Sequence, residues 1–278
     1  MTTTVQDALE KSSRKFQHQS ESASADAQLL LGEALGRPRA WILAHSEYEL
    51  SSAETAEFEV SVTQVLDGVA LPYVLGWWEF YGRRFYLEPQ VLIPRPETEL
   101  IVDQALRRSE PTSRVLDLGT GSGCIAVTLS LELPQSIVYA SDLSWKALQV
   151  ARRNIETHGV EQRVTLINSN LVEAYSGPFD LICANLPYIA SDHLQDLEVA
   201  EREPKMALDG GSLGTELIVR TLKRLPKILA GGGRALFEID PGQAVGLVDQ
   251  ARMSIPPATT RIEKDLAGRD RLLVIEYV

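Results

Sequence analysis

Hydrophobic residues recur at helical spacing through the first 70 residues, without the alternation that is typical of strands. A Gly-Arg-Pro segment interrupts this spacing, and Ser51 or Ser52 followed by Glu54 is a start signal for another helix. We therefore predict four short helices that form a small helical domain over residues 1–70. The apolar positions that mark them are Val5, Leu9 and Phe16, then Ala25, Leu29, Leu30, Leu31, Ala34 and Leu35, then Trp41 and Leu43, and last Ala56, Val60, Val62 and Val65.

The period of the pattern changes to two between Tyr73 and Leu92, on both sides of a Gly-Arg-Arg turn. Aromatic side chains, which suit a pleated surface, are crowded into this stretch. We predict a β-hairpin that serves as a linker over residues 71–92. The chain from Leu92 to Glu99 then carries two prolines, which favour an extended segment followed by a helix that begins at Pro96.

From residue 114 onward, short apolar runs alternate with helical patterns. Such alternation is typical of a mostly parallel sheet that is covered by helices on both faces. We therefore predict a doubly wound, Rossmann-like α/β domain with a seven-stranded sheet over residues 93–278. The predicted strands are 115–118, 137–140, 164–167, 181–184, 235–239, one near Thr260 and 272–277, and the predicted helices are 124–133, 145–158, 215–229 and 243–253.

Composition and charge narrow the class of partner. The 278 residues are 44% hydrophobic, which is enough for one large domain and one small domain with buried cores. The net charge of −11 argues against a broad electrostatic contact with nucleic acid, so a protein or a small molecule is the better partner. We expect a monomer without stable nucleic-acid binding.

The cysteines and the apolar runs bear on the cell compartment. Cys124 and Cys183 lack metal-ligand spacing and are typical of buried thiols in a reducing compartment, and no metal site is predicted. Neither a signal-peptide pattern nor an uncharged apolar run near the length of a membrane span is present. A cytoplasmic protein without membrane attachment is expected.

A glycine-rich loop follows the first predicted strand of the α/β domain. The strand carries Asp117 and leads into residues 119–123, Gly-Thr-Gly-Ser-Gly, before a helix opens at Cys124. Glycines let the backbone approach a ligand closely, and the start of a helix favours negative charge. A dinucleotide site would need a small residue at position 124, so the spacing fits S-adenosylmethionine better than NAD.

Polar residues also follow the second and third predicted strands of this domain. Asp142 ends the second strand, 21 residues beyond Gly121, where a carboxylate can accept both hydroxyls of a ribose. Asn170 and Leu171 follow the third strand, where the amide could bond an adenine edge and the leucine could pack on its face. A polar turn with a core leucine explains that pair equally well.

The tetrad Asn185-Leu186-Pro187-Tyr188 follows the strand 181–184, at the carboxyl end where open α/β sheets bind ligands. Asn185 offers an amide oxygen, the carbonyl of Leu186 faces no partner in its own strand, and Pro187 holds Leu186 extended. Tyr188 supplies a ring for stacking. Two acceptors and a ring suit a planar group that bears an NH2.

At these motifs the chain resembles the class I, S-adenosylmethionine-dependent glutamine methyltransferases of peptide chain release factors, the HemK or PrmC type. The resemblance covers residues 71–278 closely and the first 70 residues in pattern only. Two positions depart from the family pattern: Leu186 stands where a proline is usual, and Asn170 where an acid is common. The motifs that carry the resemblance are Pro72 to Gly76, Leu92 to Glu99, Val115 to Gly123, Asn185 to Ile189, Glu203-Pro204, Ala207 to Gly211, and Phe237 to Ile239.

The resemblance implies a role for each motif. The helical domain would recognise the substrate, and the enzyme would methylate the glutamine of the Gly-Gly-Gln motif in release factors. Asn185 and the Leu186 carbonyl would hold the amide nitrogen, and because any residue supplies that carbonyl, we expect Leu186 to preserve activity at reduced rigidity. The implied residues are, for the cofactor, Asp117, Gly119, Thr120, Gly121, Ser122, Gly123, Asp142, Asn170, Leu171 and Asn185; for catalysis and substrate, Asn185, Leu186, Pro187 and Tyr188; and for substrate, Arg95 and Glu97.

Three other functions stay open on the sequence. An RNA or DNA adenine methyltransferase would share the tetrad, and the form Asn-Leu-Pro-Tyr is similar to that of the ribosomal RNA adenine dimethyltransferases, although the charge and the missing basic stretch argue against it. A methyltransferase-like domain could serve only for binding. An NAD enzyme would also use the ribose contact of Asp142.

Overall fold

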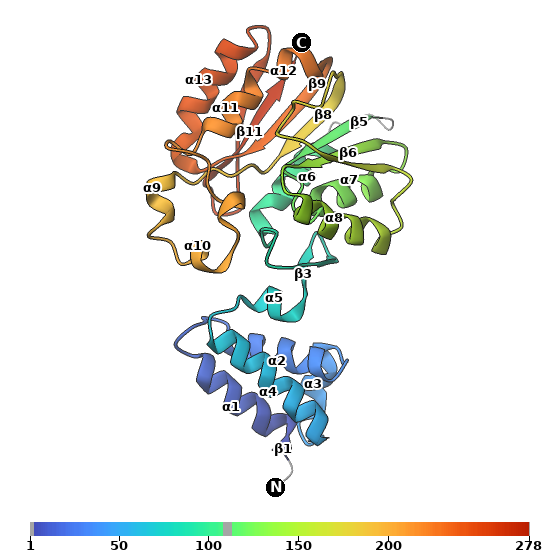
Figure 1. The fold of residues 1–278 in the computed structure, drawn as a ribbon, viewed down its shortest axis with the longest axis vertical. Coiled ribbons are helices and arrows are strands. Elements are labelled where there is room, and N and C mark those ends of the chain that lie inside the picture. Colours follow the sequence, from blue (N-terminus) through green and yellow to red (C-terminus); the bar gives the residue numbers. More distant parts are fainter. Residues whose placement is uncertain (1–2, 108–112, 278) are drawn as a thin grey trace. The chain divides into compact units, whose positions relative to one another are not determined.

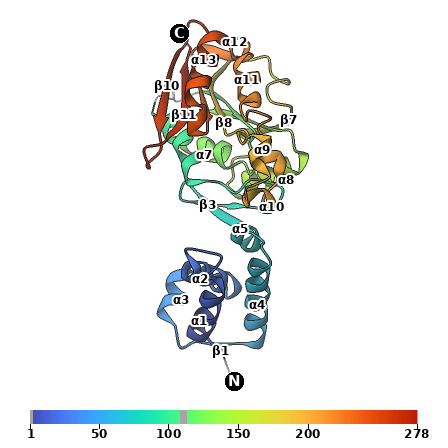
Figure 2. The ribbon, with the colours of Figure 1, turned by 90° about the vertical axis from the view of Figure 1, so that its left-hand side faces the viewer.

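The computed structural model describes residues 3–107 and 113–277, which fall into two compact units with the boundary along the chain between Gly76 and Trp77 (Figures 1 and 2). The helical domain that was predicted to end at residue 70 extends to Gly76, because residues 71–75 form a helix, α5 (Leu71–Leu75). Proline is tolerated in the first turn of a helix, and Pro72 lies there.

The first unit is a bundle in which α1, α2 and α4 pack on one another. Thr4 and Ser51 each form a capping box, at the start of α1 and of α4 respectively, so the sequence signal at Ser51 is confirmed. Two short strands, which were not predicted, pair antiparallel between the start of the chain and the residues before α4. The elements are β1 (Thr3–Thr4), α1 (Val5–Phe16), α2 (Ala23–Ala34), α3 (Arg39–Ala44), β2 (Glu49–Leu50), α4 (Ser52–Leu66) and α5.

The predicted β-hairpin opens the second unit as β3 (Trp77–Phe80) and β4 (Arg83–Tyr86). It is shorter than the predicted stretch because the residues before it are helical. Asn154, in helix α8, exchanges two hydrogen bonds with the backbone of Tyr86, at 2.7 and 3.0 Å, and so ties the hairpin to the α/β domain.

Besides the hairpin, the second unit contains one large sheet, which has seven strands within the described residues. Their order is β10-β11-β9-β8-β5-β6-β7; the five strands from β9 to β7 are parallel, and β10 and β11 pair antiparallel at one side. The predicted mostly parallel, doubly wound sheet is confirmed. The strands are β5 (Arg114–Leu118), β6 (Ile137–Asp142), β7 (Val164–Asn168), β8 (Phe179–Ala184), β9 (Leu229–Glu238), β10 (Thr259–Lys264) and β11 (Asp270–Glu276).

Helices cover both faces of this sheet, because alternate strand residues point to opposite sides. Leu116 and Ile182 share one apolar cluster with residues of α11 and α13, whereas Val115 and Leu181 share another with residues of α6 and α7. Figure 1 shows the two groups of helices on either side of the strands. The long helices of this unit are α6 (Glu99–Leu106), α7 (Cys124–Glu132), α8 (Trp145–Thr157), α11 (Glu216–Leu222) and α13 (Ala244–Ser254).

Several short elements depart from the prediction. The helix predicted over residues 215–229 is two helices, α11 and α12 (Leu225–Ile228), and Leu229 already begins β9. Pro226 explains the break, because it has no N–H to bond the Leu222 carbonyl four residues earlier and instead lies in the first turn of a new helix. The remaining short helices are too brief to show a period, and they are η1 (Pro96–Thr98), α9 (Ser191–Leu194), α10 (Val199–Arg202), η2 (Lys205–Ala207) and η3 (Pro241–Gln243).

The order of the strands places a ligand site. The chain runs outward from β5 to β7 and then crosses back to β8 on the other side of β5, so β5 lies at a switch point of the sheet. Ligands of open α/β sheets bind at the carboxyl ends of the strands at such a point. Among the described residues, no helix has the length and apolar character needed to cross a membrane.

Candidate active site

The glycine loop leaves β5 through three residues with positive φ, namely Gly119 at +70°, Gly121 at +55° and Gly123 at +81°. A Cβ at Gly121 would meet only the Gly119 carbonyl, at 4.0 Å, so a ligand can approach the backbone there. A Cβ at Gly123 would instead lie 3.2 Å from Ala151 in α8. The missing side chain at Gly121 therefore leaves the backbone of the loop accessible to a ligand, whereas the missing side chain at Gly123 allows the start of α7 to pack closely on α8.

Asp117 lies beneath this loop, fully buried. Its Oδ2 accepts a 2.6 Å hydrogen bond from the Thr120 hydroxyl, and burial raises the pKa of its carboxyl to about 7. Its Oδ1 has no partner in the described part of the chain. Asp117 thus holds the loop from below and does not line the cavity described next.

A cavity of about 350 Å³, within the usual size range for small-molecule sites, opens at the carboxyl ends of the central strands. Most of the residues predicted for the cofactor and the substrate amide line it, whereas Asp117, Gly123, Tyr188, Arg95 and Glu97 do not. The predicted residues that line it are Gly119, Thr120, Gly121, Ser122, Asp142, Asn170, Leu171, Asn185, Leu186 and Pro187.

Asp142 joins the second strand end to the glycine loop. Its Oδ2 accepts from the backbone N–H of Gly121 at 3.0 Å, and its Oδ1 accepts from that of Ser144 at 2.8 Å. Burial raises the pKa of this carboxyl, while those N–H groups act in the opposite sense. Because each carboxylate oxygen has a second lone pair, Asp142 can still accept from a ligand hydroxyl.

Asn170 and Leu171 form the wall beyond Asp142. The Asn170 amide nitrogen donates to Glu173 at 3.2 Å, which leaves its amide oxygen as an acceptor. Leu171 has a φ of +53°, a left-handed conformation that is uncommon for residues other than glycine. Both residues line the cavity, so an apolar face and an acceptor occur together there.

The tetrad lies directly beside the glycine loop. A Cβ at Gly119 would come within 3.7 Å of the Asn185 carbonyl oxygen and 3.1 Å of the Leu186 Cδ2. Leu186, which replaces the usual proline, is buried, so its side chain packs between the loop and the core. Within the described residues, the Leu186 carbonyl accepts no hydrogen bond from the protein.

The Asn185 side chain is held by a residue that the sequence patterns did not single out. Its amide nitrogen donates to the Thr98 hydroxyl at 2.9 Å, and Thr98, almost fully buried at the end of η1, also bonds Glu238 Oε2 at 2.7 Å. Both Asn185 and Thr98 line the cavity. The contact directs the other end of the amide, its oxygen, away from Thr98.

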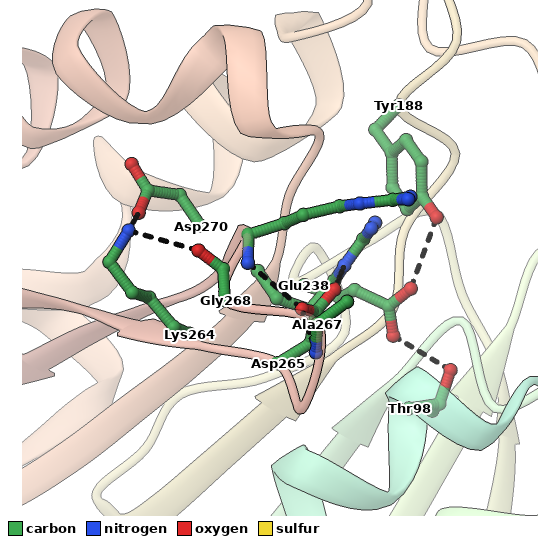
Figure 3. Close-up of polar contacts among 10 residues, drawn as sticks. Thr98, Tyr188, Glu238, Lys264, Asp265, Ala267, Gly268 and Asp270 are labelled. Atoms are coloured by element: carbon green, nitrogen blue, oxygen red, sulfur yellow. Dashed lines mark hydrogen bonds and ion pairs between the residues drawn. The ribbon is translucent and has the colours of Figure 1, made fainter.

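Tyr188 does not form the expected wall of the cavity. Its hydroxyl donates to Glu238 Oε1 at 3.1 Å (Figure 3). Its backbone oxygen accepts from the Gln243 amide at 2.8 Å. Burial, with the charge of Glu238 beside it, raises the pKa of the Tyr188 hydroxyl well above its usual range. The ring is therefore part of the support behind the site.

Glu238 joins these groups at the end of β9. Figure 3 shows its carboxyl between the hydroxyls of Tyr188 and Thr98. Burial raises the pKa of the Glu238 carboxyl, and the two hydroxyls and the nearby Arg271 guanidinium oppose that shift.

Arg95 and Glu97, which were expected to close the site over the substrate, do not line the cavity. Arg95 forms an ion pair with Glu203, whose Oε2 also accepts from the backbone N–H of Ile93 at 3.0 Å. Glu97 is exposed. The Arg95 and Glu203 pair therefore ties the segment before η1 to the chain between α10 and η2.

Other cavity residues had no sequence signal of their own. Gln90 contributes a buried amide oxygen that has no partner among the described residues, and Met206, which is 62% exposed, lines the same cavity. Met206 lies in a segment without a clear period, and Gln90 lies after the end of β4, in the part of the predicted hairpin stretch that is not a strand, so the apolar pattern does not place either side chain. Within the described residues, no cluster of three or more His, Cys, Asp or Glu side chains could hold a metal ion.

Comparisons with known proteins show the family of this chain. Residues 97–226 match the methyltransferase small domain family, and residues 7–76 match the PrmC N-terminal domain family. A release factor glutamine methyltransferase from Chlorobaculum tepidum is 39% identical over 227 residues, covering 77% of each chain. This chain belongs to the release factor glutamine methyltransferase family.

A second member of the release factor glutamine methyltransferase family, from Bacillus anthracis, is 31% identical over 282 residues, covering 98% of this chain and 99% of its own. Among solved structures, a methyltransferase from Pyrococcus furiosus has a TM-score of 0.55 at 19% identity, covering 77% of this chain and 96% of that one. This likeness supports the methyltransferase fold. The predicted family and the predicted enzyme class, a methyltransferase, are both confirmed.

Proposed function

We propose that this protein transfers a methyl group from S-adenosylmethionine to the side-chain amide nitrogen of the glutamine in the Gly-Gly-Gln motif of peptide chain release factors. The observation that carries the proposal is Asn185, whose amide nitrogen is bonded to Thr98 beside the glycine loop, in a chain of the release factor glutamine methyltransferase family. A glutamine side chain presents two N–H donors, and an oriented oxygen acceptor can recognise them.

The cavity residues fit S-adenosylmethionine. Asp142 keeps free lone pairs for the ribose hydroxyls, the open backbone at Gly121 would receive the amino-acid part, and Leu171 with Asn170 would contact the adenine. When bound, this cofactor supplies a methyl group on a positively charged sulfur that leaves as a neutral thioether. Asp117 would act from beneath, by holding Thr120 and thus the shape of the loop.

The tetrad would act by orientation. An amide nitrogen is a poor nucleophile because its lone pair is shared with the carbonyl group. The Asn185 amide oxygen and the Leu186 carbonyl would each accept one N–H of the substrate and turn its lone pair toward the methyl group. Placed dipoles and fixed geometry of this kind lower a barrier without a strong base. As the nitrogen–carbon bond forms and the sulfur–carbon bond breaks, the substrate nitrogen would release one of its two N–H protons to an acceptor oxygen or to water.

The two units would have separate roles, substrate recognition and methyl transfer. We propose that the helical unit, residues 1–76, recognises the release factor, because it matches the PrmC N-terminal domain family. The net charge of −11 favours a protein partner over nucleic acid. A substrate of the translation machinery would place the reaction in the cytoplasm, and a single chain holds every group that the proposal needs.

Mass spectrometry of the acceptor tests the proposal. The purified protein is incubated with S-adenosylmethionine and a purified release factor, and we expect one added methyl group on the Gly-Gly-Gln peptide. A release factor with glutamate in place of that glutamine serves as the control and should stay unmodified. An unmodified glutamine in the natural release factor would overturn the proposal.

A second arm of the same experiment addresses the other functions. Ribosomal RNA is offered in place of the release factor, and methylated adenine there would support the adenine methyltransferase. Stabilisation by S-adenosylmethionine without transfer to either acceptor would indicate a binding module. A melting temperature raised by NAD alone would indicate an NAD enzyme.

A further inference from the structure

A chain of hydrogen bonds runs from the cavity to a buried carboxylate. Asn185 contacts Thr98 at 2.9 Å. Thr98 contacts Glu238 Oε2 at 2.7 Å, and Tyr188 contacts Glu238 Oε1 at 3.1 Å (Figure 3). Thr98 is 2% and Glu238 is 1% exposed, so solvent does not compete for these bonds.

The sheet brings these residues together. Asn185 directly follows β8 and Glu238 ends β9, and β8 and β9 are parallel neighbours with Ala184 paired to Phe237. Thr98 enters from η1, immediately before α6, and α6 packs on β8 and β9. The three residues thus belong to three packed elements with little freedom to separate.

The direction of each hydrogen bond follows from the chemistry of its partners. An ionised carboxylate only accepts, so both hydroxyls beside Glu238 must donate to it. The Thr98 hydroxyl has one proton, and once that proton is given to Glu238, its oxygen can only accept from Asn185. Asn185 must then present its NH2 to Thr98 and its oxygen to the cavity. A protein network of this kind is what distinguishes the two ends of an amide.

Burial raises the pKa of the Glu238 carboxyl, and three neighbouring groups stabilise its ionised form against that effect. Two hydroxyl donors contact the carboxylate, and the Arg271 guanidinium lies close enough to interact with it. Arg271 is in turn paired with Asp265 at 3.4 Å. Glu97 opposes this arrangement with a like charge, but it is exposed and therefore screened.

We propose that Glu238 and Thr98 are positioning residues, which fix the Asn185 amide with its oxygen toward the substrate nitrogen. The inference rests on the proposed function, because it assigns the acceptor that the substrate amide meets. Neither residue touches the reacting atoms in this scheme. Replacing Glu238 by glutamine would let an NH2 group face Thr98, so that Thr98 could donate to Asn185 and turn the wrong end of its amide to the substrate.

The test uses Thr98→Val, which keeps the shape of the side chain and removes its hydroxyl. We expect kcat for release factor methylation to fall about 10- to 100-fold, as for other groups that orient a binding side chain. The KM for the release factor and the Kd for S-adenosylmethionine should change less than threefold. Thr98→Ser keeps the hydroxyl and should restore most of kcat.

Thr221→Val is the matched control. Thr221 is fully buried and its hydroxyl donates to the Leu217 backbone oxygen at 2.9 Å, within α11, so it has no connection to Asn185. We expect its kcat to stay within twofold of that of the unmodified protein. A Thr98→Val variant that behaves like Thr221→Val would overturn the proposal.

The double variant tests whether Glu238 acts through Thr98. Glu238→Gln alone should lower kcat about tenfold or more, since the direction of the chain is no longer fixed. Added to Thr98→Val, it should lower kcat no further, because the connection is already broken. If the fold-losses in kcat of the two single variants instead multiplied in the double variant, Glu238 would act independently of Thr98, and the positioning role would be refuted. Glu238→Gln retains hydrogen-bonding groups, so it still decides the question if Thr98→Val does not fold.

A measurement without substrate separates this inference from the proposed function. The side-chain NH2 of Asn185 is followed by NMR and assigned by its loss in Asn185→Asp. Thr98→Val and Glu238→Gln should both shift these resonances and speed their exchange with water, while Thr221→Val should leave them in place. If the unmodified protein did not methylate release factors, the proposed function would fail while this orientation could still be confirmed; unchanged resonances would refute the orientation itself.

Discussion

Asn185 lines the cavity and combines a bonded amide nitrogen with an amide oxygen that accepts no hydrogen bond from the described residues. We expect Asn185→Ala to lower kcat/KM for release factor methylation at least about 100-fold, the usual effect of removing one placed dipole. Cofactor affinity should change little, because the ribose and adenine contacts lie on other strand ends. Kinetics with the purified release factor and calorimetry with S-adenosylmethionine measure the two quantities.

The opposite pattern would speak against the role of Asn185. If the variant kept turnover within a few fold of the unmodified protein, the amide oxygen would not hold the substrate. If it lost cofactor binding instead, Asn185 would belong to the cofactor site alone. The Leu186 carbonyl is unaffected by this substitution, since it belongs to the main chain.

At the residue scale, the sequence predicted which residues lie near the cavity better than it predicted which partners their side chains contact. Asn185, Asp142 and Asn170 line the cavity as expected. Tyr188 and Arg95 are close to it along the chain, yet each pairs with a buried glutamate. We expected the Tyr188 ring and the Arg95 side chain to contact the substrate. Their partners, Glu238 and Glu203, lie far from them along the chain, and a local sequence pattern gives no information about such distant contacts.

At the scale of elements, the glycine loop depends on a close approach that only glycine allows. Gly119→Ala would impose φ of +70° on a residue with a Cβ and would press that Cβ against Leu186, 3.1 Å away. We expect the loop to shift and the Kd for S-adenosylmethionine to rise at least about tenfold, because the loss of about 1–2 kcal/mol falls on the binding conformation. Calorimetric titration measures this change.

Gly68 provides the control for that substitution. It has a φ of +94° after α4, and a Cβ there would meet nothing within 4 Å. Gly68→Ala should carry a similar backbone strain and lower the melting temperature, while leaving the Kd for S-adenosylmethionine unchanged. Equal effects of the two variants on that Kd would show that the contact with Leu186 is irrelevant.

The element boundaries show where periodicity is informative. The predicted bounds of most long helices and sheet strands agree with the structure within a few residues, because each of these elements repeats its apolar spacing over at least one full unit. The exception among the strands is β9, which begins at Leu229, six residues before the predicted start. The region between β8 and α11 contains only short helices, which are too brief to show an apolar period. Periodicity therefore could not predict that this region lines the cavity through Met206. The break at Pro226 was missed because the apolar pattern continues across it.

At the scale of the whole molecule, the site reduces the stability of the fold. Burial raises the pKa of Asp117 from 3.8 to about 7, so the folded state holds a proton in this range that the unfolded chain releases. The free energy of unfolding should therefore fall as pH rises between these values. Between pH 5 and 7 the loss from this group is about 2 kcal/mol, because each pH unit contributes at most about 1.36 kcal/mol and the folded carboxyl begins to titrate as the pH approaches 7.

Asp117→Asn tests this expectation, because the amide keeps an oxygen for the Thr120 hydroxyl and does not titrate. Urea unfolding is measured at pH 5 and at pH 8 for both proteins. We expect the unmodified protein to lose about 3 kcal/mol more than the variant over this interval. Parallel losses would mean that Asp117 does not change its charge there.

The sequence by itself determined which segments carry chemistry. The glycine loop, Asp142 and the tetrad were all found from local order, because a strand end followed by glycine or by a polar residue with proline is a short-range pattern. The alternation of strands and helices likewise fixed the class of fold, since the period of apolar positions reports which faces are buried.

Only the tertiary structure decided how Asn185 is held. Thr98 lies 87 residues before it in the chain and 140 residues before Glu238. These partners meet because β8 and β9 are neighbours and α6 covers both, and the order of strands in a sheet follows from packing of the whole domain. Local periodicity predicts on which face of its own helix or strand a side chain lies. The partner that this side chain contacts depends on which other element packs against that face.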